Sequence, residues 1–158
     1  MSKREPRGLY FEDFEIGKTY RTPRRTLTQT DIVNFACLSG DFNEVHTNWE
    51  YCASSPFGEP IAHGPLVYAI AAGLAYASGL NEGTLIALLG ITDWQMLMPV
   101  KNGDTIHLEQ EVTATRRASK GDKGVVTFDR RVRNQRDEIV QRMTSSYLFR
   151  ARPQGAGD

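Results

Sequence analysis

The sequence predicts an α+β domain in which an antiparallel sheet wraps around one long buried helix. Residues 60–81 carry no formal charge, and their apolar side chains recur at the three- and four-residue spacing of a helix face. The residues that follow change to the two-residue alternation of strands. Because a helix with so few polar positions needs a wide sheet to cover it, we expect the strands of the second half to pack around this helix.

The length and composition fit a single domain. The chain has 158 residues, of which 40% are apolar, which is enough for a core of its own. We expect residues 9–150 to form this domain, with a flexible arm at residues 1–8 and a flexible tail at residues 151–158. Basic and acidic residues balance at 19 each, so bulk charge does not favour nucleic acid as a partner.

The cysteines and the N-terminus favour a reducing cytoplasm. Cys37 and Cys52 are the only cysteines, too few for a disulfide framework or a zinc cluster. The first residues are charged and have no apolar segment behind them, unlike a secretory signal. The uncharged run of residues 60–81 includes two prolines, three glycines and a histidine, so we predict a buried helix and no membrane partner.

Residues 10–40 predict a docked segment, a strand and a helix. Residues 10–17 mix aromatic and acidic side chains and are expected to dock on the surface. The next ten residues alternate as a strand, which Pro23 restricts to an edge or bent position. Residues 28–31 then supply N-cap candidates and an early carboxylate for a helix that Gly40 ends. The segment from Asp41 to His46 is therefore expected to be a loop.

A short helix capped by Asn48, at residues 49–54, is expected before the turn residues 55–60. The long helix follows, with a broad apolar face that comprises Leu66, Val67, Ile70, Ala71, Leu74 and Ala75. Its other positions are mostly small, so a sheet or a second copy of the chain can approach closely. We therefore expect this helix to be buried almost all round, with Gly79 as its C-terminal cap.

Four strands are expected after the long helix, at residues 84–95, 105–114, 125–133 and 139–150. Turn residues at 120–124 and 134–137 join the last three strands as hairpins. His107 lies in an alternating strand and is expected on the surface. The sheet has a free edge that a second subunit can extend or cover, so a homodimer or a higher homo-oligomer is expected.

Three polar side chains that suit acid/base chemistry fall within six residues. Asp41 and His46 can jointly hold a water molecule, one removing its proton and the other positioning it. Asn43 can orient the water or lock the loop. The backbone N–H of Gly64 can donate to a carbonyl oxygen that gains negative charge, and the missing side chain lets that oxygen approach. These groups predict addition of water to an α,β-unsaturated carbonyl compound, without a metal or a redox cofactor.

Other interpretations of the same residues remain open. An aspartate and an asparagine after a helix also make an ordinary turn, because their side chains bond to their own backbone. His63 can cap or pack at the start of the long helix. It could also join Asp41 and His46 around a metal ion, although this spacing matches no strong ligand signature. Core packing or the lining of a tunnel is expected of Trp94, Met96 and Met98.

Four segments of the chain resemble the MaoC-like dehydratase family, which includes the (R)-specific enoyl-CoA hydratases: residues 10–18, 31–36, 39–46 and 60–64. The specific part is Gly-Asp-x-Asn-x-x-His followed by Ile-Ala-His-Gly. The resemblance covers roughly residues 8–150. It implies a hotdog fold, with the sheet as the bun and the long helix as the sausage, and a homodimer with its two sites at the subunit interface.

The resemblance also implies roles for individual residues. The catalytic pair falls on Asp41 and His46, the supporting amide on Asn43, and the backbone N–H that binds the thioester carbonyl on Gly64. One position departs from the family pattern, which has Asn-Pro-Leu-His where this chain has a glutamate, Glu44, in place of the proline. This change loosens the loop and adds a carboxylate near the site.

We therefore expect a hydro-lyase that reversibly hydrates a trans-2-enoyl thioester to a 3-hydroxyacyl thioester. Coenzyme A is the expected carrier and enters only as part of the substrate. Two alternatives use the same fold. An acyl-CoA thioesterase would direct water to the carbonyl carbon, and a non-catalytic module would bind the acyl thioester without turning it over.

Overall fold

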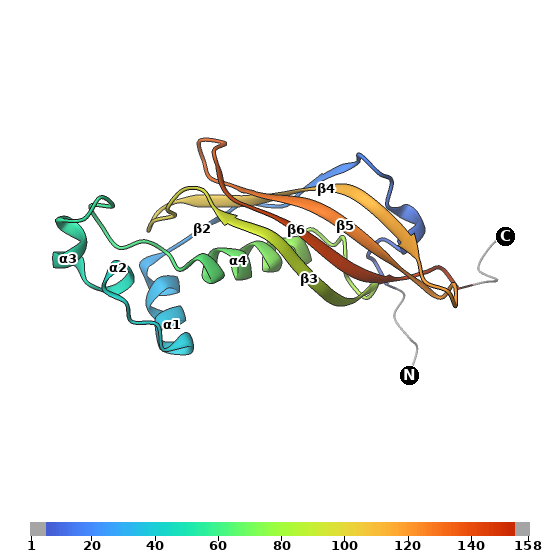
Figure 1. The fold of residues 1–158 in the computed structure, drawn as a ribbon, viewed down its shortest axis with the longest axis horizontal. Coiled ribbons are helices and arrows are strands. Elements are labelled where there is room, and N and C mark those ends of the chain that lie inside the picture. Colours follow the sequence, from blue (N-terminus) through green and yellow to red (C-terminus); the bar gives the residue numbers. More distant parts are fainter. Residues whose placement is uncertain (1–5, 154–158) are drawn as a thin grey trace.

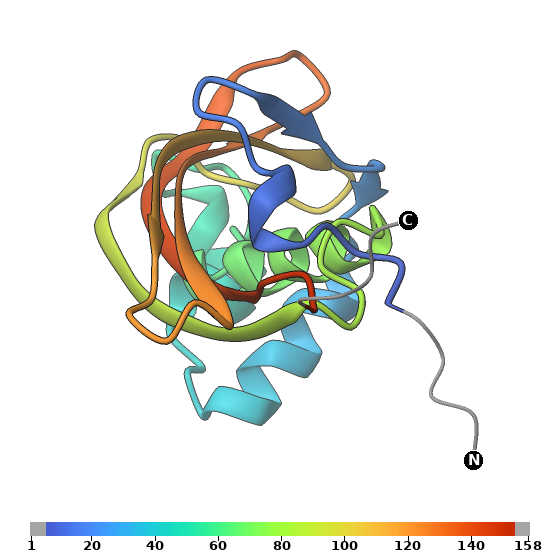
Figure 2. The same cartoon turned by 90° about the vertical axis from the view of Figure 1, so that its right-hand side faces the viewer.

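The structure, a computed structural model, describes residues 6–153. A long helix lies along the concave side of a curved antiparallel sheet, and three shorter helices gather beyond one end of it (Figure 1). In chain order the elements are η1 (Phe11–Asp13), β1 (Thr19–Arg21), β2 (Arg25–Thr26), α1 (Gln29–Ser39), α2 (Glu44–Thr47), α3 (Trp49–Ala53), α4 (Gly64–Ala77), β3 (Leu85–Met96), β4 (Thr105–Arg117), β5 (Lys123–Arg133) and β6 (Ile139–Arg150). The predicted α+β class is confirmed, and along the perpendicular view the sheet curls around α4 (Figure 2).

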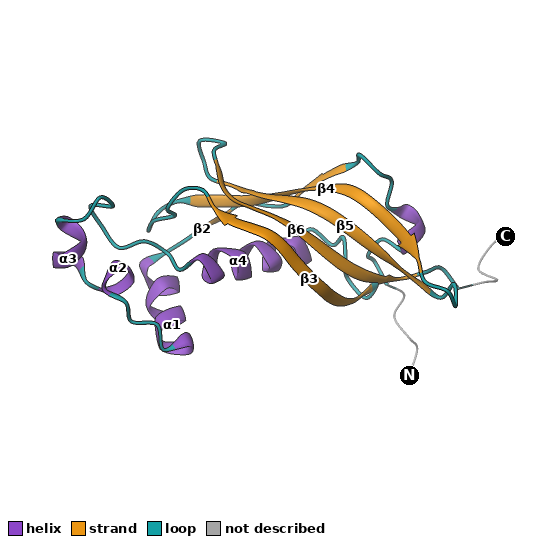
Figure 3. Cartoon of the chain, viewed as in Figure 1, coloured by secondary structure: helices purple, strands orange, loops and turns teal. Residues whose placement is uncertain are grey.

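The sheet has the strand order β1-β4-β5-β6-β3, and β2 also pairs with β4. The two predicted hairpins join β4, β5 and β6. β3 precedes these strands in the chain but lies beyond β6, at the opposite edge from β1 (Figure 3). In the described part of the chain β6 is its only partner, and the edge strand carries exposed apolar side chains: Ile86, Leu88 and Leu89.

The face predicted for the long helix is the buried face of α4. All six of its apolar residues are buried against a core that includes Ile106, Leu108 and Val132 of the sheet. The expectation of burial all round is wrong for the single chain, because Gly73 and Ala77 are exposed and Tyr76 is 63% exposed. The sheet covers only one side of the helix. None of the helices in residues 6–153 is long and apolar enough to cross a membrane.

Residues 10–27 follow the prediction, with one interruption. Phe14 is buried against Phe128 and Phe149, so the segment around η1 is docked as expected. The expected strand is divided into β1 and β2, which flank Pro23 and both pair with the edge of β4. Proline lacks the N–H that a ladder needs, which explains the interruption.

The caps predicted for α1 and α3 are present. The Thr28 side chain accepts from the Asp31 N–H, the Asp31 carboxylate accepts from the Thr28 N–H, and Gly40 ends α1 with a left-handed φ of 77°. The Asn48 side chain caps α3. These caps fix the two ends of the segment that carries the predicted catalytic residues.

The packed region extends past both expected domain boundaries. Gly8 is buried and its N–H donates to the carbonyl of Glu82 at 2.9 Å. Ala151 is buried and its N–H donates to the carbonyl of Asp122 at 3.0 Å. Arg152, in the expected tail, also donates to the carboxylates of residues 12 and 13. Residues 1–5 and 154–158 of the expected arm and tail lie outside the described residues, so their flexibility stays a prediction.

The expectation that His107 lies on the surface is wrong, because it is only 4% exposed. Glu109, the next residue on the same face of β4, is also buried and forms ion pairs with arginines 21, 131 and 133. Long arginine side chains therefore cover a sheet face that alternation alone assigns to solvent. Burial lowers the pKa of His107, and the positive charges of Arg24, Arg21 and Arg133 act in the same direction.

This lowered pKa predicts a loss of stability in acid. A histidine with a lower pKa in the folded state takes up its proton more readily when the chain unfolds, so its contribution is lost as pH falls below about 6.5. We expect the free energy of unfolding to fall less steeply in His107→Leu than in the wild type between about pH 7 and about pH 5. Urea unfolding at a series of pH values measures this, and parallel curves would refute the assignment.

Candidate active site

The structure brings Asp41, His46 and His63 together at the N-terminal end of α4. The Oδ2 atom of Asp41 lies 4.0 Å from Nε2 of His46 and 4.0 Å from Nε2 of His63. The two imidazole rings stack with their centroids 3.7 Å apart. The predicted catalytic pair therefore shares one site with a third titratable side chain, for which the sequence left capping, packing and metal binding open.

His46 lies on α2, a helix of a single turn, and not on a loop as expected. Its Nδ1 atom is 2.7 Å from the carbonyl oxygen of Ile61. Because a carbonyl oxygen only accepts hydrogen bonds, Nδ1 carries the proton of the neutral ring and Nε2 keeps its lone pair. The side chain is 13% exposed. The fold thus leaves Nε2 of His46 free to accept a hydrogen bond on the side that faces Asp41.

Glu44 starts α2, where the family pattern has proline. Its carboxylate accepts a hydrogen bond from the side-chain amide of Asn48 at 3.0 Å, and its own carbonyl accepts from the Asn48 N–H. The added carboxylate is therefore tied to Asn48 within this helical turn.

Asp41 follows the end of α1, and the two oxygens of its carboxylate have different neighbours. Oδ1 accepts from the backbone N–H of Asn43 at 3.2 Å, which is the turn that the sequence suggested as an alternative. Oδ2 faces the two histidines. The turn orients the carboxylate that faces His46, so the turn interpretation and a catalytic role do not exclude each other. The carboxylate is 53% exposed and can reach water.

Asn43 is exposed, and no described residue hydrogen bonds to its side-chain amide. Its backbone holds Asp41 through the bond just described. The supporting role of the amide itself stays a prediction.

His63 is the N-cap residue of α4 and is only 2% exposed. Its Nε2 lies 2.9 Å from the backbone carbonyl oxygen of Asp41, so this nitrogen donates. The ring packs between His46 and Phe35, whose centroid is 5.0 Å away. His63 therefore ties the start of α4 to the Asp41 backbone and supports the His46 ring. The sequence signal for this role was the Ile-Ala-His-Gly segment.

Gly64 is the first residue of α4, and none of residues 6–153 accepts a hydrogen bond from its N–H. Its carbonyl accepts from the side chain of Gln141 at 2.8 Å. A Cβ at this position would lie 2.7 Å from the terminal methyl of Met96. The missing side chain therefore leaves a free donor at a helix N-terminus with a narrow space in front of it.

A cavity of about 300 Å³ opens beside this donor. Its lining includes His46, Gly64, Met96 and Met98. The two methionines are 53% and 37% exposed, so of the two expectations for them the lining of a binding space fits better than core packing. Trp94 packs against the core instead. The base and the donor for a carbonyl oxygen thus border one apolar space.

The same cluster lacks ligands for a metal ion. One donor atom from each of Asp41, His46 and His63 lies within 4.8 Å of the others. His63 uses Nε2 to donate to a carbonyl, however, and His46 uses Nδ1 in the same way. Of the two imidazole nitrogens that lie 4.0 Å from the Asp41 carboxylate, only Nε2 of His46 therefore keeps its lone pair. The other nitrogen of His63, Nδ1, is buried without a hydrogen-bond partner among the described residues. Catalytic zinc sites use three protein ligands, and the carboxylate faces only one imidazole lone pair. Chemistry without a metal stays our prediction.

Known proteins that are similar to this chain carry related names. The model of the MaoC like domain matches residues 13–134. Protein MaoC of Klebsiella aerogenes is 46% identical over 99 residues, which are 63% of this chain and 29% of that protein. The (R)-specific enoyl-CoA hydratase of Aeromonas caviae is 30% identical over 121 residues, covering 77% of this chain and 84% of that protein. This chain thus spans less than a third of Protein MaoC.

Solved structures show the same architecture. A conserved hypothetical protein from Mycobacterium tuberculosis with a double hotdog fold superposes with a TM-score of 0.83 at 20% identity, over 98% of this chain and 48% of that one. The MaoC-like dehydratase from Rhodospirillum rubrum superposes with a TM-score of 0.80 at 30% identity, over 92% and 99%. The fold is therefore a hotdog fold. The chain belongs to the MaoC-like domain family.

Proposed function

We propose that this protein reversibly hydrates a trans-2-enoyl thioester to a 3-hydroxyacyl thioester, as a hydro-lyase with coenzyme A as the carrier. The observation that carries the proposal is the pairing of Asp41 Oδ2 with the free Nε2 of His46 at 4.0 Å. A water oxygen that donates to both atoms spans roughly 4 to 4.6 Å between them, given ordinary hydrogen-bond lengths and a water angle. The spacing therefore fits one bridging water.

The reaction follows from these positions. The water oxygen attacks the β-carbon of the enoyl group while one member of the Asp41–His46 pair takes its proton. The electrons of the carbon–carbon double bond move to the thioester oxygen, where the Gly64 N–H stabilises the enolate. A proton delivered to the α-carbon by the pair completes the hydration. The reverse sequence dehydrates the product, and no redox cofactor takes part.

The similarity to the (R)-specific enoyl-CoA hydratase of Aeromonas caviae supports this choice over thioester hydrolysis. In hydrolysis the water would attack the carbonyl carbon, next to the Gly64 donor. In hydration it attacks two atoms farther along the acyl group.

We further propose a homodimer in which a second copy covers the β3 edge. The exposed apolar side chains of β3 lie on a strand with an unpaired outer edge, and an edge of this kind is normally paired or covered. Sedimentation equilibrium gives the mass that tests it.

The exposed thiol of Cys37 and the buried thiol of Cys52 are both free, which agrees with the proposed cytoplasmic location.

The proposed reaction is tested by the ultraviolet absorbance of the conjugated enoyl thioester. We expect the pure protein to remove this absorbance from trans-2-enoyl-CoA substrates of several chain lengths, without release of free thiol. Thiol released at the same rate would instead indicate a thioesterase. Binding of the thioesters with no change in absorbance or thiol would indicate a binding module and contradict the proposal.

A further inference from the structure

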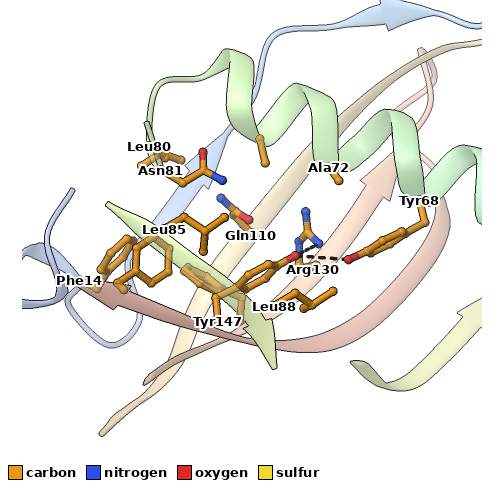
Figure 4. Close-up of a pocket in the computed structure, with 13 residues that line it drawn as sticks. Phe14, Tyr68, Ala72, Leu80, Asn81, Leu85, Leu88, Gln110, Arg130 and Tyr147 are labelled. Carbon is orange, nitrogen blue, oxygen red and sulfur yellow. Dashed lines mark hydrogen bonds between the residues drawn. The ribbon is translucent and has the colours of Figure 1, made fainter. Parts of the chain in front are cut away.

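A second cavity, of about 300 Å³, lies between α4 and the sheet (Figure 4). Like the cavity at Gly64, it is lined by residues of α4, β3 and β6, although the two cavities share no lining residue. The first cavity lies where Met96 pairs with Gln141, and the second lies where Leu85 pairs with Phe149. Its lining is mostly aliphatic and aromatic. Arg130 is its one charged residue, and none of the residues that line it is acidic.

Arg130 is 1% exposed, and no carboxylate of residues 6–153 forms an ion pair with it. Its one hydrogen bond to a described residue runs from Nη1 to the hydroxyl of Tyr147 at 2.5 Å, and its buried Nε has no partner. The rings of Tyr68 and Tyr147 lie 5.6 and 5.4 Å from its Cζ. A guanidinium offers five donors and keeps its charge, so burial without a carboxylate leaves most of its binding capacity unused.

The neighbours of Arg130 do not supply the missing negative charge. Gln110 lies directly across from it in the β4–β5 register and also lines the cavity. Burial raises the pKa of Tyr147, so its hydroxyl stays neutral at physiological pH. Asn81, which also lines the cavity, has a buried side-chain oxygen that no other described residue hydrogen bonds. Figure 4 shows Arg130, Gln110 and the two tyrosine hydroxyls converging on the same space.

We propose that this cavity binds the carboxylate of a ligand with an apolar body, and that Arg130 is the partner of that carboxylate. A guanidinium binds a carboxylate through two parallel hydrogen bonds, and the apolar walls suit a short hydrocarbon chain. The volume lies at the lower end of small-molecule sites, which span roughly 300–1,000 Å³. The carboxylate can belong to a free acid or to the far end of the substrate's own acyl group.

A carboxylate at the far end of the substrate's acyl group could reach this cavity from the proposed active site. Tyr68 lies one helical turn beyond Gly64, roughly 6 Å along α4. Trp94 packs on Tyr68 with a centroid distance of 5.4 Å and donates to Gln141, which in turn donates to the Gly64 carbonyl. Trp94 therefore contacts a lining residue of each cavity, Tyr68 of the second and Gln141 of the first.

Calorimetric titration with hexanoate and with hexan-1-ol tests the carboxylate site without relying on the proposed function. We expect saturable binding of hexanoate to the wild-type protein, at least tenfold tighter than binding of hexan-1-ol. Equal affinity for the two, or no saturable binding of hexanoate, would overturn the proposal, because the alcohol has the same six-carbon chain but lacks the anionic carboxylate.

Arg130→Met removes the charge with little change in volume and is expected to abolish the preference for hexanoate. We expect its melting temperature to equal or exceed that of the wild type, since a buried charge without a partner is often replaced without loss of stability. A purely structural arginine would give the opposite result. Arg130→Lys keeps the charge but not the paired donors, and should prefer hexanoate more weakly than the wild type does; an unchanged preference in either variant would refute the role of Arg130.

Kinetics distinguish the two sources, and this comparison alone rests on the proposed function. The substrates are trans-2-hexenoyl-CoA and its analogue with a carboxylate in place of the terminal methyl. A kcat/KM at least tenfold higher for the analogue, lost in Arg130→Met, assigns the site to the substrate. Equal values with hexanoate binding intact assign it to a free acid. If neither thioester reacts while hexanoate binding still depends on Arg130, the proposed function fails and the carboxylate site stands.

Discussion

Asp41→Asn is expected to lower kcat for enoyl-thioester hydration by about 10²-fold or more. The amide keeps the size of the carboxylate, and its oxygen can still accept the Asn43 N–H that forms the turn. What it loses is the second anionic oxygen that faces His46 at 4.0 Å. Steady-state kinetics measure the expected loss of kcat, and a melting curve shows whether the fold is retained.

Glu44→Gln is the matched control for this variant. It makes the same chemical change three residues away, at an exposed side chain whose oxygen bonds to Asn48. We expect its kcat to stay close to that of the wild type. His46→Ala should lose rate as Asp41→Asn does, because the proposed water bridges both groups. Near-normal turnover in Asp41→Asn with unchanged melting would remove the carboxylate from the mechanism.

Gly64→Ala is expected to lower kcat/KM by about 10²-fold, since a small displacement of a reacting group can cost that much. The N–H is retained, but the new methyl stands in the space from which the thioester oxygen must approach the donor. Its nearest neighbour is the terminal methyl of Met96, at 2.7 Å, which is the flexible end of a side chain. We therefore expect the fold to tolerate the change and the loss to appear in kinetics.

A double variant separates the two effects of that methyl. Met96→Ala removes the steric conflict, so Gly64→Ala combined with Met96→Ala should remain as slow as Gly64→Ala alone if the thioester oxygen is obstructed. Recovery of the rate in the double variant would show that displaced Met96, and not the blocked donor, caused the loss. Gly73→Ala, on the same helix with open space at its Cβ position, is expected to leave kcat/KM unchanged.

Local signals in the sequence predicted much of the fold. The caps of α1, the apolar face of α4 and the bounds of β6 depend on neighbouring residues or on spacing within one element, and the structure confirms them. The position of β3 beyond β6 depends on pairing between distant segments, which spacing does not reveal. His107 and Glu109 are buried on a face where Arg133 of β5 lies across from His107 and pairs with Glu109, and alternation within β4 cannot show such contacts.

The sequence predicted individual residues of the site better than it predicted how residues from distant segments contact one another. Asp41 and His46 are close in the chain, and the turn between them fixes their relation. His63 comes 17 residues after His46, so the stacking of the two rings depends on the path of the intervening chain. A signal was present for Arg130, since it occupies a core-facing position in the alternation of Val126, Phe128 and Val132. A charged residue in a core-facing position is rarely buried unless it is paired, so it indicates a binding site for a group of opposite charge.

The most direct test of the central claim is to follow the oxygen of water into the product. The protein is incubated with a trans-2-enoyl-CoA in water enriched in oxygen-18, and the product is fragmented in a mass spectrometer. Our account predicts the label in the 3-hydroxyl group of an intact thioester, and no such label above background with His46→Ala. Label in a free carboxylate would show that water attacks the carbonyl carbon, which would contradict hydration by the Asp41–His46 pair.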